Sequence, residues 1–425
     1  MISMEITRTE IIHIKNNLYY FTHIAKNIFN EFNYITRQRY FDNLKLYKEN
    51  KIRKNDVIPS ETSLYNSVSP ENNVLPKKSL QWLIKTFRTI WFSYFRALKE
   101  YYKNPDKFLG KPNIPHYKDK NGEFILIFTN QQCSIDNGIL KFPKIINISV
   151  KTRLNDDIKL MEVRIIPLGN GYNIEIVYKK NINKLLNRNK RIIGIDTGVD
   201  NIAAITNNTG LKPVIVKGGI IKSINQFYNK QISKLKSIND VLNKNNKRYT
   251  RYTNKMKLIT DNRNRKINDL FHKLSTGIIN YCLLNNIDTI VIGHNNEWKQ
   301  NVNIGKINNQ NFVQIPFNKL IKLIKYKAEE NGIEVILQEE SYTSKCSFLD
   351  NESIEKHDKY LGKRIFRGLF RTFKGILINA DINGSYNIIK KAFPNAFDGI
   401  AGLGVNPESL SIFKLLEKTT FKDGC

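Results

Sequence analysis

Long apolar runs are missing from this sequence of 425 residues. A membrane-spanning helix needs about 18 or more consecutive apolar residues, and no such stretch occurs here. The N-terminal run MISMEITRTEIIHIK carries charges where a signal peptide needs its apolar stretch. We therefore expect no membrane partner. The expected location is the cytoplasm, in association with the nucleoid, or the nucleus if the host is eukaryotic.

Cysteine is also scarce. The chain has four cysteines, which lie far apart and never form a CxxC pair. They are Cys133, Cys282, Cys346 and Cys425. This spacing argues against a disulfide framework and against a zinc site made of four cysteines, so no zinc is expected.

Acidic residues are too few to balance the basic ones. There are 38 Asp and Glu against 68 Lys and Arg, which gives a formal net charge of +30. Such an excess repels itself in the folded state and is usually relieved by a polyanion. With hydrophobic residues at 41% the chain can build packed cores, and its length predicts two or three domains. The composition favours a folded protein that binds nucleic acid.

The first expected domain, residues 1–105, has a mostly helical pattern. Apolar residues at steps of three or four predict a helix from Trp82 to Tyr102. The predicted apolar face contains Ile84, Phe87, Trp91, Phe95, Leu98 and Tyr102. Lys85 and Arg88 on the basic side are candidates for binding nucleic acid, and a solvated basic face is an equal alternative.

Short β segments fill the second expected domain, residues 106–185. The runs FILIF, GILKF, INISV, LMEVRIIPL and YNIEIVY are separated by Asn, Gly and Asp turns. Several short strands at this spacing predict a small barrel or sandwich. Residues 181–191 contain basic residues and no acidic one, which predicts a tether to the third domain.

The third expected domain, residues 186–425, has an α/β pattern. IIGID, NIAAIT and KPVIVKGG predict three successive strands, and IDTIVIGHN and IEVILQEESY predict two more with a helix between them. NGSYNIIKKAF is predicted as the last helix. Three successive strands followed by strands that alternate with helices predict an RNase H-like fold.

Three acidic residues of this domain lie at strand ends or at a helix start: Asp196, Glu340 and Asp381. Singly, each has a plainer interpretation as a turn former, a solvated strand end or a helix cap. Together they suit Mg²⁺, which prefers oxygen ligands. Two such ions about 3.5–4 Å apart can activate water and stabilise the leaving oxygen in phosphodiester cleavage. We predict that the three carboxylates bind two Mg²⁺ ions and catalyse this reaction.

Several runs resemble the TnpB-type RNA-guided nucleases of insertion sequences, especially the branch closest to the Fanzor proteins. They are GIDTGVDNIAAIT, IVIGHNNEWKQ, EVILQEESYTSK and RGLFRTFKGILINADINGSYNI. The resemblance implies a RuvC-like nuclease domain in the C-terminal half, preceded by a wedge-type β-barrel with an inserted helical recognition domain.

The resemblance also implies a function. Such a protein is an RNA-guided, Mg²⁺-dependent double-stranded DNA endonuclease encoded by a transposable element. Its guide RNA comes from the element end, and the protein reads a short target-adjacent motif while base pairing reads the rest. The implied partners are the guide RNA and the target DNA, and a monomer is favoured.

The second RuvC motif departs from the family pattern, in which a Glu usually ends the strand. Here Gly293 occupies that place. In an RNase H-like sheet the next strand is a neighbour about 4.8 Å away, so it can present the carboxylate instead. We assign this role to Glu340, with Glu339 as second choice and Glu297 as third.

The zinc ribbon of many relatives is also replaced. Cys346 and His357 cannot supply the four ligands of a structural zinc site, so residues 346–375 are predicted as a metal-free basic loop that faces nucleic acid or solvent. Its candidate nucleic-acid contacts are Lys363, Arg364, Arg367 and Arg371. Further candidates are Trp298, Lys299, Tyr342, Thr343 and Ser344, for which a buried anchor or turn-capping hydroxyls are the alternatives.

Two other functions stay open. The missing Glu at position 293 suggests a nuclease-dead, RNA-guided DNA-binding protein. An RNase H-like transposase is the third candidate, although the sequence offers no separate helix-turn-helix to recognise element ends.

Overall fold

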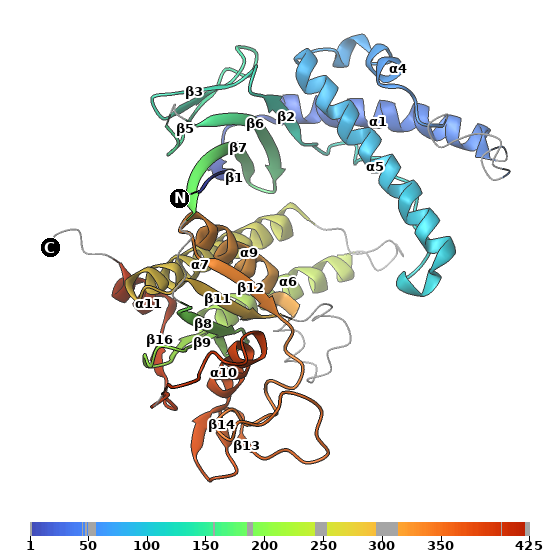
Figure 1. The fold of residues 1–425 in the computed structure, drawn as a ribbon. Coiled ribbons are helices and arrows are strands. Elements are labelled where there is room, and N and C mark those ends of the chain that lie inside the picture. The colour runs from blue at the N-terminus through green and yellow to red at the C-terminus, as the bar shows by residue number, and fades with distance from the viewer. Residues whose placement is uncertain are drawn as a thin grey trace. The chain divides into compact units, whose positions relative to one another are not determined.

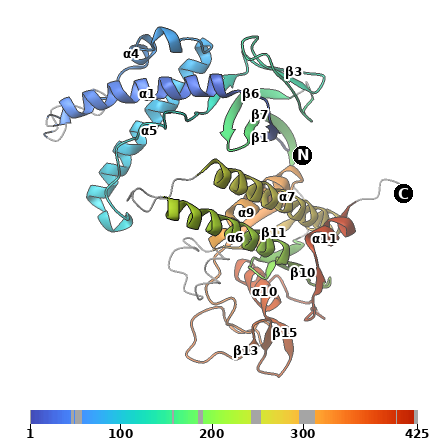
Figure 2. The same ribbon diagram turned by 180° about the vertical axis from the view of Figure 1, so that it is seen from behind.

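The computed structural model describes residues 2–44, 46, 49, 57–155, 158–184, 190–242, 253–294, 313–400 and 402–420. The chain divides into two compact units, one of Glu5–Asn181 and one of Met1–Met4 with Ile182–Cys425 (Figures 1 and 2). None of the described helices has the length and apolar character needed to cross a membrane.

The helices of the first unit bury apolar stripes. They are α1 (Tyr19–Asp42), α4 (Glu61–Asn66) and α5 (Lys77–Lys103), with the 3-10 turns η1 (Pro70–Asn72) and η2 (Pro105–Lys107). The helix predicted from Trp82 to Tyr102 is confirmed within α5, and five of its six predicted apolar positions are buried. Tyr102, the exception, is 65% exposed.

Two antiparallel sheets complete this unit. One has the order β1-β7-β6-β2 and the other β3-β4-β5. Their bounds are β1 (Ile2–Ile14), β2 (Leu126–Thr129), β3 (Ser134–Asp136), β4 (Ile139–Lys141), β5 (Ser149–Lys151), β6 (Lys159–Leu168) and β7 (Gly171–Lys184). All five predicted strands are present, while β1 and β3 were not predicted.

The details differ from the predicted barrel and tether. Within the described residues neither sheet closes on itself, so the barrel is not confirmed, and the two sheets leave the predicted sandwich as the alternative. The stretch predicted as a tether begins inside β7, which continues to Lys184. Residues 185–189 of that stretch lie outside the described residues.

The expected domain boundary near residue 105 does not appear, because helices and strands share one core. Phe87 and Trp91 of α5 belong to the same buried cluster as Phe128 of β2 and Ile174 of β7. A sheet with one apolar face must bury it against another layer, and here α5 packs on β2. Residues 1–105 and 106–185 therefore do not form separate units.

The second unit is built on a six-stranded sheet of order β12-β11-β8-β9-β10-β16. Its strands are β8 (Ile192–Asp196), β9 (Asn201–Asn207), β10 (Val214–Lys217), β11 (Thr289–Gly293), β12 (Glu334–Gln338) and β16 (Glu408–Leu410). Strands β8, β11 and β12 are parallel, and β9 runs antiparallel to β8 and β10. The succession of β8, β9 and β10 and the pairing of β11 with β12 are as predicted for an RNase H-like fold.

Helices cover both faces of this sheet (Figure 1). They are α6 (Gly219–Leu242), α7 (Asn254–Leu284), α9 (Phe317–Glu330), α10 (Ala380–Ala392) and α11 (Ile412–Thr419). Side chains alternate between faces along a strand, so Ile193 and Ile195 pack toward α7, α9 and α11. Ile192 of the same strand packs on the opposite face, against Ile388 and Ile389 of α10.

Two predictions for this unit were wrong in part. NGSYNIIKKAF lies in α10, but α10 is followed by β16, which pairs in parallel with β10, and by α11. Residues 346–375 are not all loop. They include β13 (Lys363–Phe366) and β14 (Leu369–Arg371), which form an antiparallel three-stranded sheet with β15 (Leu377–Asn379).

Candidate active site

The three predicted carboxylates gather at one edge of the six-stranded sheet. Because β8, β11 and β12 are parallel, their carboxyl ends meet at the same edge. The register pairs Ile195 with Ile292, which places Asp196 level with Gly293. Glu340 follows two residues after the end of β12, and Asp381 lies in the first turn of α10.

The electrostatics of Asp196 place the three acids in one environment. Burial raises the pKa of Asp196 well above its usual range, and the negative charges of Glu340 and Asp381 raise it further. The guanidinium of Arg364 acts in the opposite direction. Burial also raises the pKa of Glu340 to about 7, with a contribution from the charge of Glu339. A bound cation would stabilise this site, because it would offset the effect of the neighbouring negative charges on Asp196.

Two glycines make room for these carboxylates. A Cβ atom on Gly293 would collide with Oε1 of Glu340 and would lie 2.6 Å from Cδ1 of Ile388. A Cβ atom on Gly384 would lie 2.8 Å from Oδ2 of Asp196. Position 293 thus carries a glycine instead of a glutamate, and the side chain of Glu340 fills the space beside that glycine.

The neighbouring acid Glu339 is engaged elsewhere. Its Oε2 accepts a hydrogen bond from Nζ of Lys391 at 2.6 Å, and its Oε1 accepts one from the backbone N–H of Ser341 at 2.7 Å. Partial burial opposes the effect of these bonds, but together they lower the pKa of Glu339. The structure therefore favours Glu340 over Glu339. Glu297, the third choice, lies outside the described residues.

Asp381 is held by groups that the sequence did not single out. Asn379 caps α10 by accepting from the N–H of Asp381 at 3.0 Å. Nδ2 of Asn201 donates to Oδ2 of Asp381 at 2.6 Å, and Nζ of Lys217 donates to Oδ1 of Asn201 at 3.1 Å. Asn201 follows Asp196 by five residues in GIDTGVDN, but no spacing rule connects that position to an acid 180 residues away.

The carboxylates suit Mg²⁺ in donor chemistry, because carboxylate oxygen is the ligand that this ion prefers. Among the described residues, however, no three His, Cys, Asp or Glu side chains stand close enough together to hold one ion. Oδ2 of Asp381 is bonded to Asn201, and its Oδ1 lies 3.7 Å from the guanidinium of Arg364. A three-ligand arrangement would therefore require these side chains to reorient.

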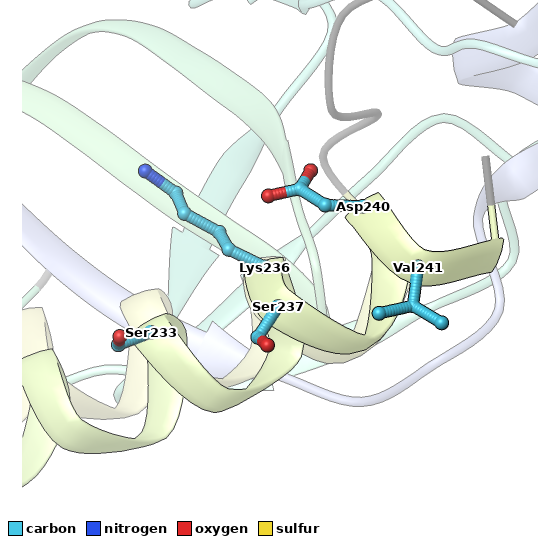
Figure 3. A pocket seen from close by; sticks show the side chains of 5 residues that line it. All are labelled: Ser233, Lys236, Ser237, Asp240 and Val241. Atoms are coloured by element: carbon cyan, nitrogen blue, oxygen red, sulfur yellow. The ribbon is translucent and has the colours of Figure 1, made fainter. Parts of the chain in front are cut away.

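A separate surface hollow of about 380 Å³ contains none of the three acids (Figure 3). Its lining comes entirely from α6 and consists of Ser233, Lys236, Ser237, Asp240 and Val241. Side chains of one helix do not converge on a ligand from several sides, so we assign no function to this hollow.

The segment after Glu340 is fastened to α10 by buried amides. Nδ2 of Asn387 donates to the carbonyls of Thr343 and Cys346, both at 2.8 Å. Asn383 donates to the same Cys346 carbonyl at 2.9 Å and accepts from the N–H of Phe348 at 3.0 Å. Because these groups are buried and paired, the start of the segment is fixed relative to Asp381.

Two carboxylates hold together the segment that was predicted as a metal-free basic loop. Glu352 is only 5% exposed and accepts from the N–H groups of Ser347, at 2.6 Å, and Leu361, at 2.8 Å. Oδ2 of Asp350 accepts from Oγ of Ser347 and from the N–H of Phe373, both at 2.6 Å. Carboxylate bonds to backbone N–H groups are strong, so they connect distant parts of this segment.

Two of the basic residues of the β13–β14 hairpin form ion pairs with acids near the candidate site. The guanidinium of Arg364 lies 3.7 Å from Asp381, and that of Arg367 lies 2.7 Å from Oδ2 of Asp200. Lys363 and Arg371 are exposed opposite each other in the hairpin register. The hairpin thus brings positive charge to the rim of the acidic site.

The remaining predicted nucleic-acid contacts have mixed surroundings. Thr343 is buried and donates its hydroxyl to the Glu340 carbonyl at 2.9 Å, which favours the capping alternative. Tyr342 is partly exposed with a positive φ of 68°, and Ser344 is exposed. Both stay candidates for phosphate contacts.

In the first unit, Lys85 is exposed on α5 and lies over the Trp82 ring at 5.5 Å. Arg88 is instead an internal anchor. It donates to the carbonyl of Pro59 and lies over the Phe92 ring at 5.5 Å. Trp298 and Lys299, which were also predicted to bind nucleic acid, lie outside the described residues.

Comparisons with known proteins match segments of the chain that contain strands of this sheet and the three acids. Residues 175–299 match the OrfB_IS605 family, described as "Probable transposase", and residues 317–388 match the "Cas12f1-like, TNB domain". The two matches contain Asp196, Glu340 and Asp381. TnpB-like protein ORF457 of Acidianus two-tailed virus is 27% identical over 223 residues, which are 50% of this chain and 44% of that relative. The match therefore spans less than half of the relative's length.

Solved structures with a similar overall course include a Cas12f1–sgRNA–target DNA complex and CRISPR-Cas_phi3, titled a mini-RNA-guided endonuclease. The first has a TM-score of 0.45 at 15% identity and covers 87% of this chain and 82% of its own. The second has a TM-score of 0.39 at 11% identity and covers 94% of each chain. The two family matches and the viral relative show that the chain is similar to TnpB-type proteins over part of its length.

Proposed function

We propose that this protein is an RNA-guided, Mg²⁺-dependent endonuclease that cuts double-stranded DNA and is encoded by a transposable element. The observation that carries the proposal is the placement of Asp196, Glu340 and Asp381 at one sheet edge, with Glu340 against Gly293 and Asp196 against Gly384 of α10. The two family matches, which contain these three positions, support it.

In this proposal the three carboxylates hold Mg²⁺, which would lower the pKa of an attacking water and stabilise the leaving 3′ oxygen. The 2.6 Å hydrogen bond from Asn201 fixes the present orientation of Asp381, which would change when the ion binds. Gly293 leaves the space that Glu340 occupies. No covalent bond to the protein is needed, so a nucleophilic side chain is not required.

Arg364 also contributes to the proposed reaction. Its side chain is 44% exposed and lies beside Asp381. A guanidinium can bind a phosphate through two parallel hydrogen bonds. When a DNA strand enters, Arg364 would contact the phosphate to be cut. Its contact with Asp381 balances part of the negative charge of the acidic edge.

The net charge of +30 supports the proposed partners, since a guide RNA and its duplex with target DNA present many phosphates. Base pairing would select the target and the protein would read only a short adjacent motif. The guide RNA would be a transcript from the end of the element.

The experiment uses the full chain purified with its co-purifying RNA. Sequencing that RNA defines a matched plasmid, and we expect Mg²⁺-dependent cutting of this plasmid but not of one with an unrelated target. Asp196→Ala should lose cutting while it still binds the matched DNA. Full cutting by Asp196→Ala would refute the active-site assignment.

A nuclease-dead, RNA-guided DNA-binding protein is the second candidate. It is favoured by the absence, among the described residues, of three acids positioned to hold one ion. Binding of the matched target with no cutting in Mg²⁺ or Mn²⁺ would support it. Joined DNA products instead of cut ones would indicate a transposase.

A further inference from the structure

One aromatic side chain beside the proposed active site takes no part in the proposed cleavage. Phe366 ends β13, and its side chain is 71% exposed. A phenyl ring left in water forgoes the free energy of apolar burial. An exposed ring next to a functional site is therefore a candidate for contact with a partner.

The neighbours of Phe366 fix its place relative to the acids. Arg364, two residues earlier, reaches Asp381, and Arg367, the next residue, reaches Asp200. The pairing register shifts between Arg364 and Phe366, which is the mark of a β-bulge, and a bulge changes the direction of the side chains beside it. Phe366 therefore lies in the chain between two arginines whose side chains reach acids at the rim of the site.

The charge of the hairpin indicates what kind of partner it binds. Residues 361–379 contain five basic residues and no acidic one. They are Lys363, Arg364, Arg367, Arg371 and Lys374. An exposed aromatic ring flanked by cations is suited to a nucleic-acid strand, because the ring stacks on a base while the cations meet the phosphates on either side.

We propose that Phe366 stacks on an unpaired base of the DNA strand that enters the active site, while Arg364 and Arg367 contact the flanking phosphates. A base inside a duplex has both faces covered by its neighbours, so a stacked base must first leave the duplex. The hairpin thus selects single-stranded DNA at the point of cutting. This inference rests on the proposed function for the identity of the strand, but the stacking itself can be measured without any cutting.

Phe373 provides a matched control. It belongs to the same segment and is 76% exposed, but it lies beyond β14 and is not placed between the two arginines that reach Asp381 and Asp200. Removal of its ring takes away the same number of exposed apolar atoms. A general effect of ring removal would therefore affect both positions.

The experiment measures binding of a short single-stranded oligodeoxynucleotide with 2-aminopurine at successive positions, in Ca²⁺, to the full chain with its RNA. We expect quenching at one or two positions in the wild type. In Phe366→Ala this quenching should be lost and the dissociation constant should rise about tenfold, the size expected for one stacked base. Phe366→Trp should restore both, and Phe373→Ala should change neither. The unfolding temperature of each variant shows whether it is folded.

Three results would overturn the inference. Unchanged quenching in Phe366→Ala would mean that the ring does not stack on the DNA. Equal losses in Phe366→Ala and Phe373→Ala would indicate a general effect of exposed rings. A weaker hold on the co-purified RNA, with DNA binding unchanged, would assign Phe366 to RNA instead. A protein that never cuts but shows the expected quenching would refute the proposed function and leave the stacking site standing.

Discussion

At the scale of single residues, Gly293 and Glu340 depend on each other. Gly293→Ala places a methyl group where Oε1 of Glu340 lies and 2.6 Å from Cδ1 of Ile388. Overpacking of this kind costs about 1–3 kcal/mol, and here it displaces a proposed metal ligand. We expect Gly293→Ala to cut matched plasmid at least tenfold more slowly, while its free energy of unfolding falls only by the overpacking cost.

Gly219 is the control for that variant, because a Cβ atom there meets no atom within 4 Å. Gly219→Ala, at the start of α6, should cut at the wild-type rate. Undiminished cutting by Gly293→Ala in a steady-state plasmid assay would show that Glu340 does not need the space beside Gly293.

The raised pKa of Glu340 predicts how stability depends on pH when Mg²⁺ is absent. Burial moves this pKa from 4.5 to about 7. Between these values the folded state binds more protons than the unfolded state, so the free energy of unfolding decreases as pH rises through this range. Asp196, whose pKa is also raised, acts in the same direction.

Urea unfolding at a series of pH values in a chelating buffer measures this slope. Glu340→Gln cannot lose a proton, so its free energy of unfolding should fall less steeply between pH 4.5 and about 7. Identical slopes in the wild type and Glu340→Gln would mean that Glu340 does not titrate in this range.

At the scale of elements, the segment from Cys346 to β15 depends on Glu352. Glu352→Ala leaves the backbone N–H groups of Ser347 and Leu361 without their acceptor. Each unsatisfied buried donor costs about 1–3 kcal/mol. Since this segment carries Arg364 and Arg367, we expect Glu352→Ala to lower both the free energy of unfolding and the cutting rate.

Chemical denaturation of the full chain tests this prediction, and Glu355→Ala, an exposed acid of the same segment, should change the midpoint little. If the carboxylate bonds of Glu352 and Asp350 hold the segment without zinc, as we predict, a zinc-specific chelator should leave the wild-type midpoint unchanged. A large loss of stability on chelation would contradict this account.

The elements also show what local sequence patterns can and cannot predict. The buried stripe of α5 follows from the spacing of its apolar residues. Strands β8, β9 and β11 follow from short continuous apolar runs, which are typical of strands buried on both faces. Strand β16 has only three residues, and its pairing with β10 is not visible in its own sequence. The shared core of residues 5–181 likewise depends on contacts between distant segments.

Some residues of the candidate site can be predicted from local sequence patterns, and others cannot. Asp196 and Asp381 follow from motifs at a strand end and a helix start. The sequence ranks Glu340 above Glu339, and the structure adds a physical reason for that order, because Glu339 is bonded to Lys391 and Ser341. Asn201 carried no signal, since its role comes from a contact across the fold.

At the scale of the whole molecule, charge and architecture point to the same partners. The excess of basic residues suits long polyanions rather than a small substrate, and the acidic edge is a local exception within a chain of net charge +30. Metal ions at that edge would let a negatively charged strand approach three carboxylates. The proposed function therefore requires the acids and the basic surroundings together.

The most direct test compares two adjacent acids in the full RNA-bound protein. Cutting of matched plasmid in Mg²⁺ is measured for Glu340→Gln and Glu339→Gln, with binding of the same DNA measured in parallel. Loss of cutting in Glu340→Gln alone, with DNA binding retained in both variants, is the result that the geometry at the edge of β8, β11 and β12 predicts. Wild-type cutting by Glu340→Gln, or its loss only in Glu339→Gln, would contradict it.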